Sequence, residues 1–426
     1  MAVFVPFVLP GERVEAEIRR EKSGFARASV SQLIDASPDR IEARCPYFRQ
    51  CGGCHYQHIS YQRQLQFKAN ILRETFQRIA KIDLPSEIQL HPSPPWNYRN
   101  RTRLQVRASP EFALGYLRFG SHEFLPIREC PISSPLLNRA LARLVELGGL
   151  NCPAAIEEIE LFADAPDEHL LAWAFCGRDA DRKDLLPWAE SLQRELPQIR
   201  GMTFFSSRRS SEQRFEEDAS TDASVLAQAG AKSIRYRTNN HEYQVSAGAF
   251  FQVNRYLIDE LISVVTANAS GDLALDLYAG VGLFSVPLAE KFRHILGVEA
   301  SHTSHADFVQ NVPANVKAVV ARTSDFLRRD YPKSDYRSSD YPKNRPVRQR
   351  PDLVVLDPPR TGAGKAVIAS LVELGAPRVR YVSCDPATLA RDIALLLAAG
   401  YRVEEAHLFD LFPETFHIES VLLLGR

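Results

Sequence analysis

The stretch Arg380-Tyr-Val-Ser-Cys-Asp-Pro-Ala-Thr-Leu-Ala-Arg391 holds the signals around which the chain is organised. An apolar, strand-like run ends at Ser383, Cys384 follows, and an Asp-Pro pair suits the start of a helix over residues 387–397. Cys384 is therefore predicted at the C-terminal end of a strand, where open parallel sheets bind ligands. A helix N-terminus beside it would lower the thiol pKa and favour the thiolate. The alternative is a buried, inert cysteine.

Strands and helices alternate through the rest of the C-terminal region. The sequence Leu273-Ala-Leu-Asp-Leu-Tyr-Ala-Gly-Val-Gly-Leu-Phe-Ser285 predicts strand, glycine-rich turn and helix, and later strands end at Glu299 and Asp357. This alternation indicates a doubly wound, Rossmann-like α/β domain over residues 236–426. Gly280 precedes Glu299 by 19 residues, close to the spacing between a nucleotide loop and a ribose-binding acid. A serine replaces the third glycine of the dinucleotide fingerprint, so the turn alone does not distinguish NAD from other adenosine-type cofactors.

A short repeat interrupts this domain. Residues 330–344 consist of Asp-Tyr-Pro-Lys-Ser, Asp-Tyr-Arg-Ser-Ser and Asp-Tyr-Pro-Lys-Asn. Charged pentads of this kind cannot bury a core, so we expect a disordered insert over residues 330–350.

Three cysteines lie close together near the N-terminus, and two of them flank a Gly-Gly pair. We interpret Cys45, Cys51 and Cys54 as a ligand set completed by the distant Cys130, because a Cys-Pro dipeptide occurs at positions 45 and 130. Four thiolates suit zinc or an iron–sulfur cluster. A redox dithiol and haem attachment at Cys-x-x-Cys-His are alternatives. Haem attachment is disfavoured because it belongs to exported proteins and no export signal is evident.

Two further regions suggest contact with a nucleic acid. Residues 11–44 alternate in polarity between turn signals, which predicts a small OB-like β-barrel over residues 1–44. Residues 45–235 are expected to form a central α+β domain. Within it, a predicted strand over residues 98–107 carries cations along one face. These cations are Arg99, Arg101, Arg103 and Arg107. The face is either solvated or a strip that contacts RNA phosphates.

Length, composition and net charge limit the number of domains and the classes of partner that the chain can have. A chain of 426 residues with 45% hydrophobic residues suggests two or three globular domains. The formal net charge is zero, so any nucleic-acid surface must be a local patch. The first residues lack a basic signal-peptide region, and no apolar run approaches the roughly 18 residues that cross a bilayer. We expect a cytoplasmic monomer without membrane contact.

Taken together, these stretches resemble the TrmA-like family of RNA uracil-5 methyltransferases, which use S-adenosylmethionine. The resemblance extends over nearly the whole chain. It rests on the cysteine cluster and on five ordered motifs: Phe-Phe-Gln-Val-Asn, Leu-Asp-Leu-Tyr-Ala-Gly-Val-Gly, Asp-Pro-Pro-Arg-x-Gly, Tyr-Val-Ser-Cys-Asp-Pro-Ala-Thr-Leu-Ala-Arg-Asp and Phe-Pro-x-Thr-x-His-x-Glu. The N-terminal module is similar to a TRAM barrel. The combination is most similar to the cluster-bearing members that form 5-methyluridine in 23S ribosomal RNA, and the T-loop of transfer RNA is the alternative substrate.

The resemblance implies a role for each matched residue. Cys384 would be the nucleophile that attacks C6 of uracil, and Glu419 the base that removes the proton from C5. The residues implied at the cofactor are Gln252, Tyr278, Glu299 and Asp357. The ligands implied for a [4Fe–4S] cluster are Cys45, Cys51, Cys54 and Cys130. Three features depart from the family pattern: Ala279, where a second cysteine is common, Asp385, where asparagine is usual, and the pentad insert. Asp385 is expected to raise the pKa of Cys384.

Two other functions compete with this interpretation. A methyltransferase acting on a small molecule or a protein would form no RNA adduct and would leave the N-terminal module unexplained. A non-catalytic RNA-binding protein on a degenerate enzyme fold would not need Cys384, Asp357 and Glu419 together.

Overall fold

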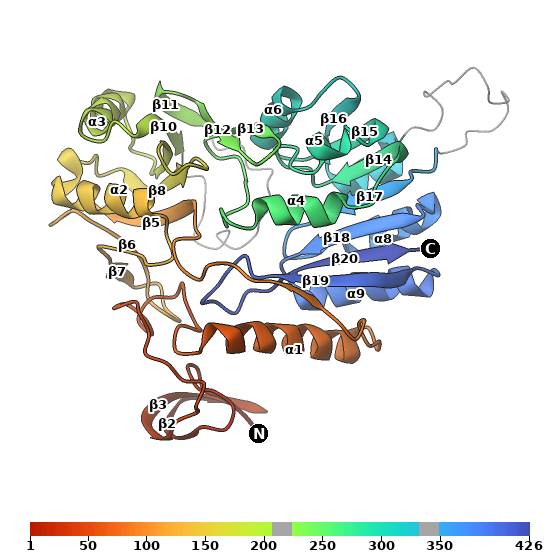
Figure 1. The fold of residues 1–426 in the computed structure, drawn as a ribbon. Helices are drawn as coiled ribbons and strands as arrows, with labels where there is room; N and C mark the ends of the chain where they lie inside the picture. The colour runs from red at the N-terminus through yellow and green to blue at the C-terminus, as the bar shows by residue number, and fades with distance from the viewer. Residues whose placement is uncertain (207–223, 332–348) are drawn as a thin grey trace.

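The computed structural model describes residues 1–206, 224–331 and 349–426. The predicted insert at 330–350 lies almost entirely outside these ranges. The described strands form sheets of three, seven, two and eight strands (Figure 1).

The eight-stranded sheet near the C-terminus confirms the predicted α/β architecture. Its order is β16 (Val316–Val320), β15 (Phe292–Glu299), β14 (Gly271–Leu277), β17 (Leu353–Leu356), β18 (Arg378–Ser383), β20 (Glu419–Gly425), β19 (Arg402–Phe409) and β4 (Gln89–His91). The sequence did not reveal that β20 runs antiparallel to both its neighbours, β18 and β19, whereas the other adjacent pairs are parallel. The chain therefore returns along the sheet, and β20 begins at the edge where β18 ends.

Helices cover both faces of this sheet, each over its own apolar core. One core contains residues of α4 (Ile258–Thr266), α5 (Ser285–Leu288) and α6 (His302–Asn311). The other contains residues of α1 (Tyr61–Ile79), α8 (Gly364–Leu374) and α9 (Pro386–Ala398). Side chains alternate along each strand, so neighbouring residues of β18 and β20 contribute to different cores.

Helix α1 and strand β4 extend this layer with residues from much earlier in the chain. Apolar residues recur at a helical period over residues 61–79, which predicts a helix there. The structure has that helix as α1, and its Leu72 and Phe76 are fully buried. It packs against α9, and β4 pairs in parallel with β19 at the sheet edge (Figure 1). Residues 61–91 thus pack with the C-terminal sheet, so the predicted division at residue 235 does not separate the two large sheets in sequence.

The seven-stranded sheet forms the central region. Its order is β11 (Val225–Gly230), β10 (Ile199–Ser206), β9 (Leu170–Cys176), β8 (Ile156–Ala163), β5 (Arg101–Arg107), β6 (Ala113–Leu117) and β7 (Phe124–Pro126). Helices α2 (Pro135–Glu146) and α3 (Arg182–Glu195) pack over one face and share its apolar core. The hairpin of β12 (Ser233–Arg237) and β13 (Glu242–Ser246) connects this region to α4.

The N-terminal strands form a small separate sheet of β1 (Ala2–Phe4), β3 (Phe25–Asp35) and β2 (Arg13–Lys22). Most residues of β2 are exposed, and the local core is limited to residues such as Leu9, Ala26 and Ala28. The three strands agree with the predicted β content, and closure into a barrel stays a prediction.

No described helix combines the length and apolar character needed to cross a membrane.

Candidate active site

Cys384 lies where the sequence predicted it, between the end of a strand and the start of a helix. Strand β18 ends at Ser383 and α9 begins at Pro386. Asp385 is the N-cap of α9, and its carboxylate accepts a 2.8 Å hydrogen bond from the Thr388 amide. The negative charge of Asp385 is therefore engaged by the helix N-terminus, which favours anions. Its effect on the thiol stays a prediction.

Glu419 begins β20, close to the point where β18 ends. Ser383 pairs with Ser420 in the antiparallel ladder, and Cys384 and Glu419 are the next residues of the two segments beyond that last pair. Val421 belongs to the core beneath α4, and Glu419, two residues earlier in β20, lies on the same face of the sheet. Cys384 is half-buried, whereas Glu419 is buried. The thiol that follows β18 and the carboxyl group that begins β20 thus lie at the same edge of the sheet.

The glycine-rich turn after β14 forms the neighbouring part of this edge. Tyr278 has a positive φ of 65°, a sparsely populated conformation for a residue with a side chain. Gly280 also has a positive φ of 56°, and a Cβ there would meet no atom within 4 Å. Its amide donates a 2.8 Å hydrogen bond to Glu299, whose other carboxylate oxygen accepts from Ser301. The turn therefore leaves open space beside Gly280.

Several buried acids converge here, and neighbouring carboxyl groups raise the pKa of each. Burial raises the pKa of Asp357 to about 7, and Asp276 and Glu299 raise it as well. Burial raises the pKa of Glu419 well above its usual range, and Asp357 adds to this while Arg360 opposes it. Mutual effects of this kind require that the carboxyl groups lie near one another. Such a concentration of negative charge suits a ligand that carries positive charge.

Asp276 belongs to this group but was absent from the predicted site. Its carboxyl group is fully buried and accepts a 2.6 Å hydrogen bond from Ser285, the serine at the position of the third fingerprint glycine. The other oxygen, Oδ1, has no hydrogen-bond partner within the described residues. Burial raises its pKa to about 6. The available signal was an acid in the middle of the apolar strand 273–277, where an unpaired charge is costly.

The other predicted cofactor residues lie around the same edge. Tyr278 directly follows β14, and burial raises its pKa to about 12. Gln252 is buried in the loop before α4, and its carbonyl accepts a 3.0 Å hydrogen bond from Asn100. Two residues on, the Asn254 side chain donates to the carbonyls of Asp410 and Leu411, just after β19. The Gln252 loop therefore contacts the segment that leads to Glu419.

The four predicted cluster ligands are partly gathered. Cys54 is buried in a small cluster with Tyr98 and Ile132, and Cys130, which comes from a separate loop, packs against that cluster. Burial raises the pKa of Cys45, Cys51 and Cys54, and Cys130 raises all three further. The structure contains no disulfide among the seven cysteines. The donor set has the right chemistry for a cluster, but among the described residues no group of three or more His, Cys, Asp or Glu side chains is arranged to hold a metal ion. The cluster stays a prediction.

The arginines of β5 are largely compensated. Arg101 lies 3.7 Å from Glu160 and its guanidinium stacks over Phe162 and Trp173. Arg103 forms an ion pair with Glu158. Arg107 is exposed and stacks over Phe124. The partners Glu158 and Glu160 come from the adjacent strand β8, which the sequence of β5 does not reveal.

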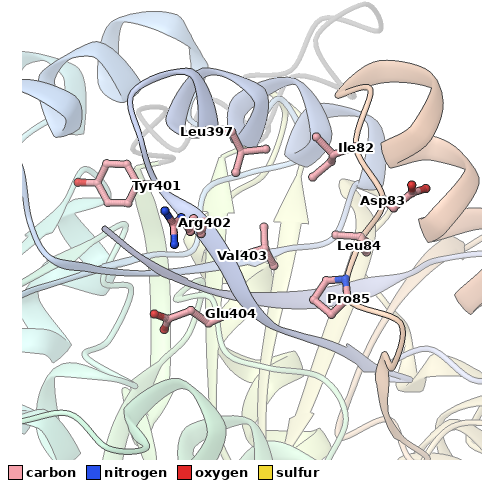
Figure 2. A pocket seen from close by; sticks show the side chains of 9 residues that line it. All are labelled: Ile82, Asp83, Leu84, Pro85, Leu397, Tyr401, Arg402, Val403 and Glu404. Atoms are coloured by element: carbon pink, nitrogen blue, oxygen red, sulfur yellow. The ribbon is translucent and has the colours of Figure 1, made fainter.

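A cavity of about 520 Å³ lies away from this site (Figure 2). It is lined by residues 82–85 after α1, by Leu397 near the end of α9 and by residues 401–404 at the start of β19. Cys384 precedes the opposite end of α9. The cavity is therefore distinct from the edge that carries the acids and the thiol.

Comparison with known proteins connects this geometry to a family. Residues 60–426 match the family model described as tRNA (Uracil-5-)-methyltransferase. A 23S rRNA (uracil(1939)-C(5))-methyltransferase, RlmD, of Halomonas elongata is 33% identical, with 99% of this chain and 84% of the relative covered. An uncharacterised RNA methyltransferase of Streptomyces avermitilis is also 33% identical, covering 99% of this chain and 92% of that protein.

A solved structure shares the fold. The crystal structure of the Pyrococcus abyssi tRNA (uracil-54, C5)-methyltransferase in complex with S-adenosyl-L-homocysteine superposes with a TM-score of 0.74 at 24% identity, and covers 99% of this chain and 95% of that one. The family resemblance inferred from the ordered motifs is confirmed, because the family model spans all of them except the cysteines before residue 60. The chain belongs to the tRNA (uracil-5-)-methyltransferase family.

Proposed function

We propose that the protein methylates C5 of a uridine in RNA with S-adenosylmethionine as methyl donor. The observation that supports the proposal is that Cys384 and Glu419 lie directly beyond the last paired residues of β18 and β20, at the same edge of the sheet as the glycine turn after β14. When bound, S-adenosylmethionine supplies an electrophilic methyl group on a positively charged sulfur. Gln252, Tyr278, Glu299 and Asp357 would hold it. The uncompensated acids Asp276 and Asp357 fit a cationic ligand.

Cys384 would begin the reaction as a thiolate. C5 of uracil is a poor nucleophile, so the thiolate first forms a bond from sulfur to C6, and the C5–C6 double-bond electrons move toward C5 and the C4 carbonyl. C5 would then form a bond to the methyl carbon, while the methyl–sulfur bond of the donor breaks and its electron pair stays on the sulfur, which becomes a neutral thioether. The uridine must leave its stack to reach this edge of the sheet, at a cost of a few kcal/mol.

Glu419 would complete the reaction as the base. The carboxylate takes H5 as a proton, and the electrons of the C5–H bond form the new C5–C6 double bond. The C6–S bond breaks and its electron pair leaves with Cys384 as thiolate. The product is 5-methyluridine and the thiol is regenerated for another cycle.

The test is a covalent trap. With S-adenosylmethionine and a uridine-containing RNA, Glu419→Gln should accumulate an enzyme–RNA adduct that survives denaturing electrophoresis, because H5 cannot leave. Cys384→Ala should form no adduct and release no tritium from C5-labelled uracil. An active Cys384→Ala variant, or an active wild type that modifies only small molecules, would refute the proposal.

For the RNA substrate we propose 23S ribosomal RNA. The supporting observation is the 33% identity with a protein named for that substrate, which extends over the N-terminal residues that the family model does not cover. Transfer RNA is the alternative. Mapping 5-methyluridine in both RNAs after deletion of the gene decides between them: loss confined to transfer RNA would overturn the proposal.

We further propose that Cys45, Cys51, Cys54 and Cys130 hold a [4Fe–4S] cluster, and that residues 1–44 form a TRAM-like module, residues 45–235 a central RNA-contacting domain and residues 236–426 the methyltransferase domain. The proximity of Cys130 to the other three thiols supports the first part. Protein purified without oxygen should contain about four iron and four sulfide per chain. Replacing Cys130 by serine should remove the absorbance of the cluster, and a zinc-only protein would refute the assignment.

A further inference from the structure

The loop that leads into Glu419, residues 410–418, is held by segments from the opposite end of the chain. It connects β19 to β20, and Asp410, Glu414 and Thr415 within it are buried. Glu414 has a positive φ of 67°. A loop with buried polar groups and an unusual backbone conformation needs specific partners to keep it in place.

Gln64 of α1 supplies two of these partners. Its Nε2 donates to the Glu414 carboxyl group at 3.1 Å, and its Oε1 accepts from the Glu414 amide at 3.1 Å. The same Nε2 also donates to the carbonyl of Ile59 at 2.9 Å. Gln64 is fully buried, so water cannot replace these bonds. One side-chain amide therefore joins the start of α1 to the loop before the proposed base.

Lys68, one turn further along α1, supplies the next anchor. Its ammonium group donates to Asp410 at 2.6 Å and to the carbonyl of Phe412 at 3.0 Å. The side chains of Lys68 and Asp410 have no exposed surface. Burial lowers the pKa of Lys68, and Asp410 opposes that effect. Ion pairs of this kind are strongly orienting because an unpaired buried charge is costly.

The segment that carries Cys45, Cys51 and Cys54, residues 45–58, which we call the cysteine loop, holds the 410–418 loop from another side. The amides of His55 and Tyr56, directly after Cys54, both donate to the Glu414 carbonyl at 2.9 Å. The Tyr98 hydroxyl donates to the carbonyl of Pro413 at 3.1 Å. Helix α1 and the cysteine loop thus meet at Glu414, five residues before Glu419 in the sequence.

Cys384 lies in the turn between β18 and α9, where Ser383 and Asp385 hydrogen-bond each other and Asp385 caps the helix. The backbone on both sides of the thiol is therefore held within that turn. Glu419 directly follows the 410–418 loop and occupies the first position of its strand, so we expect displacement of the loop to move Glu419 more than the thiol.

We propose that Gln64 and Lys68 are positioning residues for removal of H5, acting through the 410–418 loop on the aim of Glu419. The inference rests on the proposed function, and it assigns Gln64 and Lys68 to one step of the reaction, the removal of H5. Loss of either anchor should slow proton transfer from C5 to Glu419, and with it re-formation of the C5–C6 double bond and departure of the thiolate. Attack of Cys384 on C6 should be nearly unaffected. A displacement of about 1 Å at a reacting group can cost on the order of 100-fold in rate.

The experiment compares two Gln→Met variants of the same helix. Gln64→Met removes the anchor. Gln77→Met removes an exposed 2.8 Å hydrogen bond to Asp83 that lies away from the loop. In single-turnover reactions we expect Gln64→Met to release H5 about 10- to 100-fold more slowly. Its adduct should form within about threefold of the wild-type rate, so adduct accumulates. Gln77→Met should match wild type in both measurements.

A second variant tests the same role without leaving an unpaired buried charge that could unfold the protein. Lys68→Met/Asp410→Leu replaces both buried charges with apolar side chains, which avoids leaving one unpaired. It should also accumulate adduct. The inference is overturned if either folded variant loses adduct formation and H5 release in parallel, or changes neither. If wild type itself neither forms adduct nor releases H5 from any RNA, the proposed function fails. If wild type is active and Gln64→Met behaves identically, only the positioning role fails.

Discussion

The ligand edge of the C-terminal sheet and the arginine-bearing strand of the central sheet treat buried charge in opposite ways. At the ends of β14 and β17, Asp276 and Asp357 lie close together and each has a raised pKa. On β5, Arg101 and Arg103 face Glu160 and Glu158 of the adjacent strand and stack over aromatic rings. The first region leaves like charges uncompensated, whereas the second neutralises its charges internally.

The difference separates a site prepared for a ligand from a surface that stabilises the fold. Mutually repelling carboxyl groups are unfavourable in the unbound protein, and a cationic ligand relieves the repulsion. Ion pairs between neighbouring strands need no ligand. The arginines that first suggested an RNA strip are therefore better explained, at Arg101 and Arg103, as part of the packing between β5 and β8.

The largest expected effect is on stability, at Arg101. Its side chain is 11% exposed and that of Glu160 is 13% exposed. Arg101→Met should lower the free energy of unfolding by about 3 kcal/mol, because Glu160 would be left buried without its partner. Urea denaturation followed by circular dichroism measures this. The double variant Arg101→Met/Glu160→Gln should recover most of the loss.

An effect of Arg101→Met on RNA binding in place of stability would contradict the contrast between the ligand edge of the C-terminal sheet and strand β5. If Arg101→Met left stability unchanged but weakened RNA binding, with a shallower dependence of affinity on salt, this arginine would be a phosphate contact and not a packing element.

The next effect contrasts two acids at the two ends of β17. Asp357→Asn should weaken S-adenosylmethionine binding by about 10- to 100-fold, or roughly 1.4 to 2.7 kcal/mol. It should also raise the melting temperature of the unbound protein, because one repelling charge is removed.

Asp352, at the other end of β17, accepts hydrogen bonds from the amides of Asp272 and Leu273 at 2.7 and 3.1 Å. Asp352→Asn should therefore lower stability by about 1 kcal/mol and leave cofactor affinity unchanged. Calorimetry and thermal melts on both variants test the pair, and the same sign of stability change in both would contradict it.

A smaller effect should appear in the pH dependence of cofactor binding. Asp357 has a pKa of about 7 without ligand. A positively charged ligand favours the carboxylate, so its pKa falls on binding and protons are released at neutral pH. Affinity should then rise with pH up to about 7 and level off above it. Between pH 7 and pH 6 it should fall about fivefold. Titration calorimetry in buffers of different ionisation enthalpy measures the proton release, and Asp357→Asn should flatten the profile. A constant affinity from pH 6 to pH 8 would count against the role of Asp357.

Local signals in the sequence predicted the features that depend on neighbouring residues. The end of β18 at Ser383 and the start of α9 at Pro386 follow from an apolar run broken by an Asp-Pro pair. Helix α1 follows from its apolar period. The turn around Gly280 follows from its glycines, which adopt the positive φ that such a turn requires.

Features that depend on distant pairing were not predicted in the same way. The antiparallel direction of β20 and its register with β18 bring Glu419 to the end of the sheet where Cys384 lies, and nothing in either strand alone specifies them. The partners of Arg101 and Arg103 lie on β8, and Gln64 meets Glu414 across 350 residues of sequence. Propensity and periodicity describe one segment at a time, so they cannot report which segments come together.

The smallest expected effect is at Arg107, and it sharpens the comparison within β5 itself. Arg107 is exposed, lies 5.0 Å over the ring of Phe124, and makes no ion pair among the residues that the structure describes. Arg107→Gln should weaken RNA binding about two- to threefold at 0.1 M salt and reduce the slope of log affinity against log salt by about one. The matched variant Arg103→Gln should leave that slope unchanged, because Glu158 already neutralises Arg103. Filter binding over a range of salt concentrations separates the outcomes. Equal slope changes in both variants would mean that RNA displaces the glutamate, and that the charges of the central sheet are available to a ligand just as those of the C-terminal sheet are.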